Sequence, residues 1–252
     1  MKPPSFPIDV GGARTTAILY AAALAEGGGG RPVATLATLA LAHGAGAPQT
    51  HPWMVGMARA LAGRGLDVVT FNFLYADARR RAPDKNEVLE ATWRAVLRAL
   101  ADGPSPLRAR ARLFIGGKSM GGRIATQVAA GAAAPADSAP KGAIGAGPAG
   151  EAPIAGVVLF GYPLHPPGKP DVLRVAHLPR VSVPLLFVQG SRDAFGSPAE
   201  LSPHLRGLAL GTRLFVVEGG DHSLAVRKGA GAAEISARVA DEVVRFVSAV
   251  SA

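Results

Sequence analysis

The chain reads Leu113-Phe114-Ile115-Gly116-Gly117-Lys118-Ser119-Met120-Gly121-Gly122-Arg123-Ile124 at the point that decides its fold. The first three residues are apolar, as in a buried strand, and the paired glycines that follow favour a tight turn. Met120, Ile124 and Val128 then recur at helical spacing. Between strand and helix lies Gly117-Lys118-Ser119-Met120-Gly121, a G-x-S-x-G pattern in the setting typical of a nucleophile elbow.

Two other interpretations of this stretch were weighed. Gly117-Lys118-Ser119 matches the end of a phosphate-binding P-loop, but that motif requires glycine where this chain has Arg112 and a loop where it has an apolar strand. The P-loop is therefore rejected. Ser119 could also be an ordinary helix N-cap. The pattern alone leaves that second alternative open, and residues further along the chain make it the weaker one.

Length and composition indicate one globular domain. A chain of 252 residues is long enough for a large α/β core, and the absence of cysteine excludes disulfides, thiolate metal sites and a cysteine nucleophile. The first residues lack the apolar core of a signal peptide, and no apolar stretch is typical of a membrane span. We therefore expect a soluble cytoplasmic protein with no membrane partner, and no cofactor or metal.

The formal net charge of +9 raises the question of a nucleic-acid partner. Most Lys and Arg residues stand singly, however, and the one basic run, Arg79-Arg80-Arg81, has no interleaved aromatic residues. This distribution favours a solvated basic surface over nucleic-acid binding.

Strands and helices are expected to alternate along the chain, which predicts an α/β fold with a mainly parallel central sheet and helices on both faces. The predicted strands are Thr15–Tyr20, Val33–Ala42, Asp67–Phe73, Leu113–Ile115, Ile154–Phe160, Val183–Val188 and Thr212–Val217. The predicted helices begin at His51, near Asp84 and Glu87, after Ser119, and at Ala232. Asp84 and Glu87 suggest a capping box at the start of the second helix, whose predicted apolar face is Val88, Trp93, Val96, Leu97 and Leu100. Glu26-Gly27-Gly28-Gly29-Gly30 is interpreted as a hairpin-like turn between the first two strands.

The Ala-, Gly- and Pro-rich segment at about 132–153 is interpreted as a low-complexity insertion within a single domain, 1–252. Because the helix after Ser119 runs away from the serine, the insertion is predicted to lie at the opposite rim of the sheet. No stretch is long enough for a separate cap domain over the site.

Small residues after the second strand, in His43-Gly44-Ala45-Gly46-Ala47, are typical of an oxyanion loop, whose backbone N–H groups approach a substrate oxygen. An ordinary glycine-rich turn is the alternative. The N–H groups of Ala45 and Met120 are the predicted oxyanion donors. The candidates for substrate contact at the same rim of the sheet are Gly44, Trp53, Tyr75 and His165. Trp53 lies at the opening of the helix that follows His51 and could equally belong to the core.

A serine hydroxyl needs a base within reach and a third group that orients the base. In sheets of this kind the chain order is Ser, acid, His, each at the carboxyl end of a strand. His222 alone follows the final strand, and Asp193 follows the one before it. Other histidines and acids lie out of order, in the insertion, at predicted helices or, for Asp221, next to His222. The predicted triad is Ser119, Asp193 and His222.

These features together resemble a small α/β-hydrolase, in a dienelactone-hydrolase-like branch of predicted bacterial hydrolases related to Tex30 and KANSL3. The resemblance spans nearly the whole chain and rests on six motifs: His43-Gly44-Ala45-Gly46, Phe71-Asn72-Phe73-Leu74-Tyr75, Gly117 to Arg123, Gly161 to Pro170, Gly190-Ser191-Arg192-Asp193-Ala194-Phe195-Gly196, and Gly220-Asp221-His222-Ser223. Leu74 stands where relatives commonly carry proline. The resemblance implies an α/β-hydrolase fold without a cofactor, and does not imply a substrate.

Two functions of different class follow from the sequence. The first is a serine hydrolase that cleaves ester or related acyl bonds of a small molecule. The second is a non-catalytic binding or scaffold module on the same fold. A complete set of Ser119, Asp193, His222 and oxyanion glycines favours the first, because a module without activity has no physical need for all of them.

Overall fold

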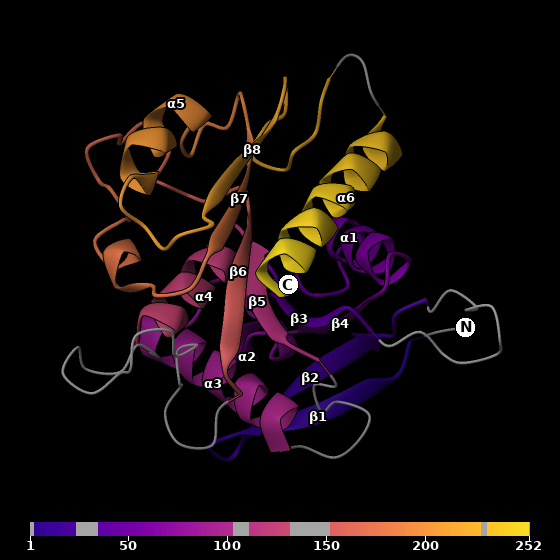
Figure 1. Cartoon of the computed structure of the whole chain (residues 1–252). Coiled ribbons are helices and arrows are strands. Elements are labelled where there is room, and N and C mark those ends of the chain that lie inside the picture. The colour runs from indigo at the N-terminus through magenta and orange to yellow at the C-terminus, as the bar shows by residue number, and fades with distance from the viewer. Residues whose placement is uncertain (1–2, 24–34, 103–110, 132–151, 228–230, 252) are drawn as a thin grey trace, which may run out of the picture.

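The computed structural model describes residues 3–23, 35–102, 111–131, 152–227 and 231–251. Within these residues one eight-stranded sheet has the order β1-β2-β4-β3-β5-β6-β7-β8 (Figure 1). The strands are β1 (Ser5–Val10), β2 (Ala13–Tyr20), β3 (Ala37–Ala42), β4 (Leu66–Phe71), β5 (Leu113–Lys118), β6 (Ile154–Phe160), β7 (Leu185–Gly190) and β8 (Arg213–Val217). Strands β3 to β8 pair in parallel, and β2 is antiparallel to both of its neighbours.

Helices cover both faces of the sheet. They are α1 (Pro52–Ala62), α2 (Leu74–Asp77), α3 (Asn86–Asp102), α4 (Met120–Gly131), α5 (Pro198–Leu201) and α6 (Ala232–Ser251), with short 3-10 helices η1 (Leu178–Arg180) and η2 (Ser202–Leu205). Figure 1 shows α1 and α6 on one side of the sheet and α3 and α4 on the other. Each pair packs on its own apolar cluster, so the sheet separates two cores. The predicted fold class is confirmed.

The hairpin-like pairing predicted for the first two strands is wrong. Strand β4 lies between β2 and β3, pairing with β2 antiparallel and with β3 in parallel. The glycine run itself, 26–30, lies outside the described residues. The glycine run suggested a tight turn that would pair β2 with β3. Instead, β3 pairs in parallel with two later strands, β4 and β5, and this central position buries all of its residues.

Strand β1 was not predicted, because Pro3, Pro4 and Pro7 argue against a strand. The structure resolves this conflict by placing β1 at the edge of the sheet, where it pairs only with β2. A proline lacks the backbone N–H that a second neighbouring strand would need, so an edge is where it is tolerated.

Helix α3 differs from its prediction in two details. Asp84 does not cap α3. Its carboxylate accepts from the backbone N–H of Tyr75 at 2.9 Å, in the first turn of the short helix α2. Val88, predicted to face the core, is 37% exposed, and the next residue, Leu89, is buried in its place. Leu89 stands four residues before Trp93 and seven before Val96, so helical spacing places Leu89, and not Val88, on the buried face.

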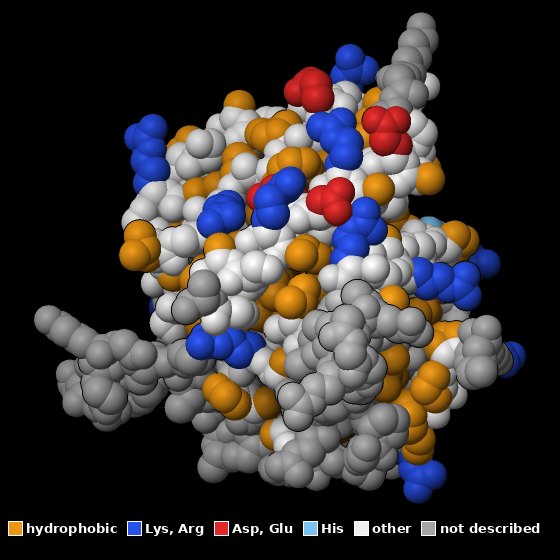
Figure 2. All heavy atoms as spheres, turned by 45° about the vertical axis from the view of Figure 1, so that its right-hand side comes forward, with side chains coloured by type: hydrophobic (Ala, Val, Ile, Leu, Met, Phe, Trp, Pro, Cys, Tyr) orange, Lys and Arg blue, Asp and Glu red, His pale blue; other side chains and the backbone are white. Residues whose placement is uncertain are grey.

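Between β6 and β7 the described chain forms only a loop and η1, so nothing in it makes a separate cap domain. The predicted low-complexity insertion lies almost entirely outside the described residues. On the face shown in Figure 2, Lys and Arg side chains are scattered, with Asp and Glu among some of them.

Candidate active site

Ser119 lies at the junction of β5 and α4, in a strained backbone conformation with φ of 51°. The flanking glycines are required by close backbone approach. A Cβ on Gly117 would stand 2.6 Å from the carbonyl oxygen of Ala42, and one on Gly121 would stand 2.5 Å from that of His43. These contacts are tighter than any side chain allows, so the G-x-S-x-G pattern is a steric consequence of strand and helix crossing beside β3.

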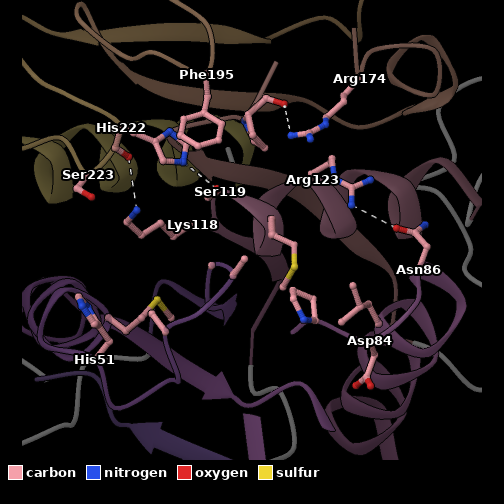
Figure 3. Close-up of a pocket in the computed structure, with 18 residues that line it drawn as sticks. His51, Asp84, Asn86, Lys118, Ser119, Arg123, Arg174, Phe195, His222 and Ser223 are labelled. Carbon is pink, nitrogen blue, oxygen red and sulfur yellow. Dashed lines mark hydrogen bonds between the residues drawn. The ribbon is translucent and has the colours of Figure 1, made fainter. Parts of the chain in front are cut away.

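The three residues of the predicted triad lie in hydrogen-bond contact. The Nε2 atom of His222 is 2.8 Å from the Ser119 Oγ, as Figure 3 shows, and its Nδ1 is 2.9 and 3.0 Å from the two carboxylate oxygens of Asp193. A ring protonated on Nδ1 donates to Asp193 and accepts the hydroxyl proton of Ser119 on Nε2. Loops after β5, β7 and β8 thus supply one member each.

Asp193 is held from behind. Its side chain is fully buried, and its two oxygens accept from the Gln189 side-chain amide at 2.9 Å and from the backbone N–H of Phe195 at 2.8 Å. The Gln189 amide nitrogen also contacts the carbonyls of Tyr162 and Gly196. This network orients the carboxylate toward the imidazole without neutralising it, since none of these donors is charged.

His222 is carried by a tight turn that Asp221 builds. The Asp221 carboxylate accepts from the backbone N–H groups of Ser223 and Ala225, at 2.7 and 3.0 Å. It therefore serves the backbone of the turn and leaves the ring of His222 to Asp193. The Phe195 ring stacks on the imidazole with centroids 4.0 Å apart and so limits its rotation.

Two further contacts hold this turn from below. The Nζ of Lys118 is 3.5 Å from the carbonyl oxygen of His222 (Figure 3). The same Nζ lies over the Trp53 ring, and the Trp53 indole N–H donates to the Ser223 carbonyl. Burial lowers the pKa of Lys118, while the charges of Asp193 and Asp221 raise it.

The loop after β3 lies against Ser119. A Cβ on Gly44 would stand 3.5 Å from that of Ser119, so the backbone of this loop is in close reach of the serine. His43, fully buried, holds the loop: its Nδ1 donates to the Gly44 carbonyl at 2.8 Å, and its Nε2 accepts from the backbone N–H of Phe73 at 3.1 Å. Burial lowers the pKa of His43 and keeps the ring neutral, as these two roles require.

A cavity of about 600 Å³ opens over Ser119 and His222. Of the predicted site residues it is lined by Ser119, His222, Gly44 and both predicted oxyanion residues, Ala45 and Met120. Asp193 stands behind His222, as an orienting acid should.

Three residues predicted to contact substrate do not line this cavity. Trp53 turns its indole to the Ser223 carbonyl, as described above. Tyr75 is 1% exposed, and its ring stacks on Phe73. His165 is 5% exposed, with Nδ1 2.9 Å from the Pro166 carbonyl oxygen and Nε2 3.3 Å from a Glu200 oxygen. Trp53 lies in the first turn of α1, Tyr75 in α2 and His165 in the loop after β6. Packing and hydrogen bonds hold all three side chains outside the cavity lining.

Other lining residues were not singled out from the sequence. Among them are Phe195, two residues after Asp193, and the basic residues Arg123 and Arg174. Arg123 could have been suspected, because it lies one helical turn after Ser119 on the same helix face. Nothing in the local sequence of Arg174 distinguishes it from the other dispersed arginines.

Within the described ranges, no group of three or more His, Asp or Glu residues could hold a metal ion. No described helix is long and apolar enough to cross a membrane.

Solved structures with the same architecture come from several bacteria. An alpha-beta serine hydrolase homologue from Coxiella burnetii is similar with 17% identity and a TM-score of 0.64, covering 99% of this chain and 97% of that one. A dienelactone hydrolase from Anabaena variabilis has 18% identity and a TM-score of 0.66, with 98% and 97% covered. A serine hydrolase described as lacking a lid, from Xanthomonas campestris, has 16% identity and a TM-score of 0.60, with 99% and 94% covered.

At these identities the solved structures show the fold alone. The family itself is shown by a sequence model that matches most of the chain. That model, for the alpha/beta hydrolase domain, matches residues 35–248, from just before β3 to within α6. The narrower branch with Tex30 and KANSL3 stays a prediction. Sheet order, elbow and family match together place the chain in the alpha/beta hydrolase family.

Proposed function

We propose that the protein is a serine hydrolase that cleaves ester or related acyl bonds of a small molecule. Ser119 Oγ attacks the carbonyl carbon while His222 Nε2 takes the hydroxyl proton, and Asp193 stabilises the imidazolium that forms. The bond to the leaving group then breaks, and His222 protonates that group. Water, activated by the same histidine, hydrolyses the acyl-enzyme and restores the serine.

The backbone N–H groups of Met120 and Ala45 are proposed to hold the oxyanion. Both residues line the cavity beside Ser119, and Met120 begins α4. The N-terminal turn of a helix has free N–H groups and the positive end of the helix dipole, both of which favour a developing negative charge.

The observation that carries this proposal is the pair of contacts made by His222, at 2.8 Å to Ser119 and at 2.9 Å to Asp193. A scaffold module on this fold is the alternative function. It would need the buried core but not a strained serine, a buried carboxylate aimed at an imidazole, and an open cavity above them.

Fluorophosphonate labelling and a series of p-nitrophenyl esters of increasing chain length test the proposal. We expect the wild-type protein to be labelled at Ser119 and to hydrolyse at least one ester. Ser119→Ala should lose labelling and several orders of magnitude in rate, because loss of a triad member removes the activated nucleophile.

Ser202→Ala is the matched control, since Ser202 is exposed and does not line the cavity. It should retain both labelling and rate. A folded Ser119→Ala protein that kept near-full activity would refute the assignment of the nucleophile, and a wild-type protein that neither reacts with the probe nor cleaves any ester would favour the scaffold alternative.

A further inference from the structure

Two arginines from different parts of the chain enter one end of the cavity. Arg123 projects from the first turn of α4, and Arg174 from the loop between β6 and η1 (Figure 3). Both are only half-buried. The backbone N–H of Arg123 donates to the carbonyl of Ser119 at 3.0 Å, so the arginine begins one helical turn from the proposed nucleophile. One turn of α-helix advances by about 5.4 Å.

Neither guanidinium has a carboxylate partner within the described ranges. Arg123 contacts only the side-chain oxygens of Asn86, at 3.3 Å, and Gln127, at 3.4 Å. Arg174 contacts the Pro163 carbonyl at 3.5 Å. All three acceptors are neutral and the distances are long, whereas an arginine paired with a carboxylate normally makes shorter, charge-assisted bonds.

The cavity is therefore positively charged. Lys118, Arg123 and Arg174 line it, against Asp84 alone among the acids, and the Asp84 carboxylate is already occupied by Arg80 and by the backbone N–H of Tyr75. Burial lowers the pKa of Arg123, the charge of Arg174 lowers it further, and Tyr162 and Glu90 raise it. An anion bound between the two guanidinium groups would offset their mutual repulsion, and the open cavity gives it access.

We propose that Arg123 and Arg174 bind a carboxylate at the far end of the substrate, so that the substrate class is a half-ester of a short dicarboxylic acid or a similar acyl compound with a remote carboxylate. This inference rests on the proposed hydrolase function. Apolar side chains of Leu89, Pro163 and Phe195 line the same cavity and suit the short carbon chain that would join carboxylate and ester.

Arg123 could instead serve only to join α3 to α4 through Asn86 and Gln127. Such a role predicts that replacing Arg123 lowers stability and affects charged and neutral substrates alike. The proposed role predicts a change in the preference between them. The two possibilities are distinguished by the ratio of kcat/KM for the charged substrate to that for the neutral one, and not by either value alone.

The hydrolysis test compares monomethyl glutarate with its neutral isostere, methyl 4-carbamoylbutanoate, by titration of released acid. We expect kcat/KM for the carboxylate to exceed that for the amide by about ten- to a hundredfold, as for a charge-assisted contact. Arg123→Gln and Arg174→Gln should each remove most of this preference, because kcat/KM should fall far more for the carboxylate than for the carboxamide, which does not need the charge.

Two matched variants serve as controls. Arg206→Gln removes a positive charge from an exposed residue outside the cavity and should preserve the preference. Arg123→Lys keeps the charge and should retain part of the preference, through a higher KM for the carboxylate more than a lower kcat.

A binding test does not depend on hydrolysis. In the Ser119→Ala background, calorimetry should show that monomethyl glutarate binds at least tenfold more tightly than the amide, and that adding Arg123→Gln abolishes the difference. Equal binding of the two compounds, or a difference that survives both arginine replacements in folded protein, would overturn this inference. If the charged compound binds preferentially and the wild type cleaves no ester, carboxylate binding by the two arginines stands, while the proposed function fails and with it the half-ester as a substrate.

Discussion

Ser119 has a φ of 51°, in a region that residues with a side chain rarely adopt. Replacing it should therefore separate strain from chemistry. Ser119→Gly and Ser119→Ala both remove the hydroxyl and should both be inactive. We expect the free energy of unfolding to be about 1 kcal/mol higher for the glycine variant than for the alanine variant, because glycine adopts positive φ without a steric penalty.

Urea denaturation followed by circular dichroism measures this difference, and Ser202 provides the control. Its backbone is helical, with φ of −52°, so there the order should reverse and alanine should be the more stable replacement. The same order at both positions would show that Ser119 is not strained.

Asp193 is the acid whose removal tests the orientation of the imidazole. Asp193→Asn places an amide where Nδ1 of His222 now donates at 2.9 Å and favours the wrong tautomer. We expect a loss of kcat on the order of 10² or more, smaller than the ~10⁴ known for a well-studied triad, because the cavity over His222 admits water. Asp171→Asn, at an exposed residue in the preceding loop, should change kcat little. If Asp193→Asn changed kcat little and Asp171→Asn lowered it strongly, the acid would be Asp171, in the loop one strand earlier.

At the scale of elements, the crossing of β5 and α4 beside β3 depends on glycine. Gly117→Ala would place a Cβ 2.6 Å from the Ala42 carbonyl oxygen and the same distance from the Gly121 backbone, none of which is a flexible side-chain end. We expect it to lower the free energy of unfolding by about 2–4 kcal/mol, through backbone shifts that overpacking forces, and to abolish activity.

Gly56→Ala is the matched substitution. Gly56 lies inside helix α1, and a Cβ there meets nothing within 4 Å. Alanine should raise stability at this position by about 0.5–1 kcal/mol, because glycine loses more conformational freedom in a helix. Thermal or urea denaturation of both variants gives the comparison, and two effects of the same sign would contradict the steric explanation.

At the scale of the whole molecule, two buried histidines link stability to pH. Burial and the charges of Arg123 and Arg180 lower the pKa of His177 to about 4, and burial lowers the pKa of His43. The unfolded chain, with an ordinary histidine pKa of about 6.5, binds more protons between these limits. The free energy of unfolding should therefore fall as the pH falls from about 6.5 toward 4, with His177 contributing about 1–3 kcal/mol.

Urea denaturation at pH 7.5, 6 and 5 measures this slope. His177→Gln removes the titrating ring and keeps a polar group near the Thr126 hydroxyl, which His177 contacts at 2.7 Å. The variant should show a flatter dependence on pH. An unchanged slope would mean that other groups control acid stability.

Much of this molecule follows from patterns that span only a few residues. Apolar runs and helical spacing predicted all the parallel strands and the main helices, and G-x-S-x-G predicted the elbow, because backbone shape and helix face depend on neighbours in the sequence. The chain order of Ser119, Asp193 and His222 suggested the residues that lie in contact, since parallel strands bring their carboxyl ends to one rim. Their catalytic role remains the proposal to be tested.

Only the tertiary structure decided which segments and side chains meet across long separations. It placed β4 between β2 and β3 and β1 at the edge. It also turned Tyr75 and His165 into the wall and brought Arg123 and Arg174 together in the cavity. A loop residue's direction is set by packing against distant elements and not by its own neighbours in sequence. The sequence by itself determined the fold class and the strained serine turn, whereas the shape and charge of the cavity arise only when the sheet assembles.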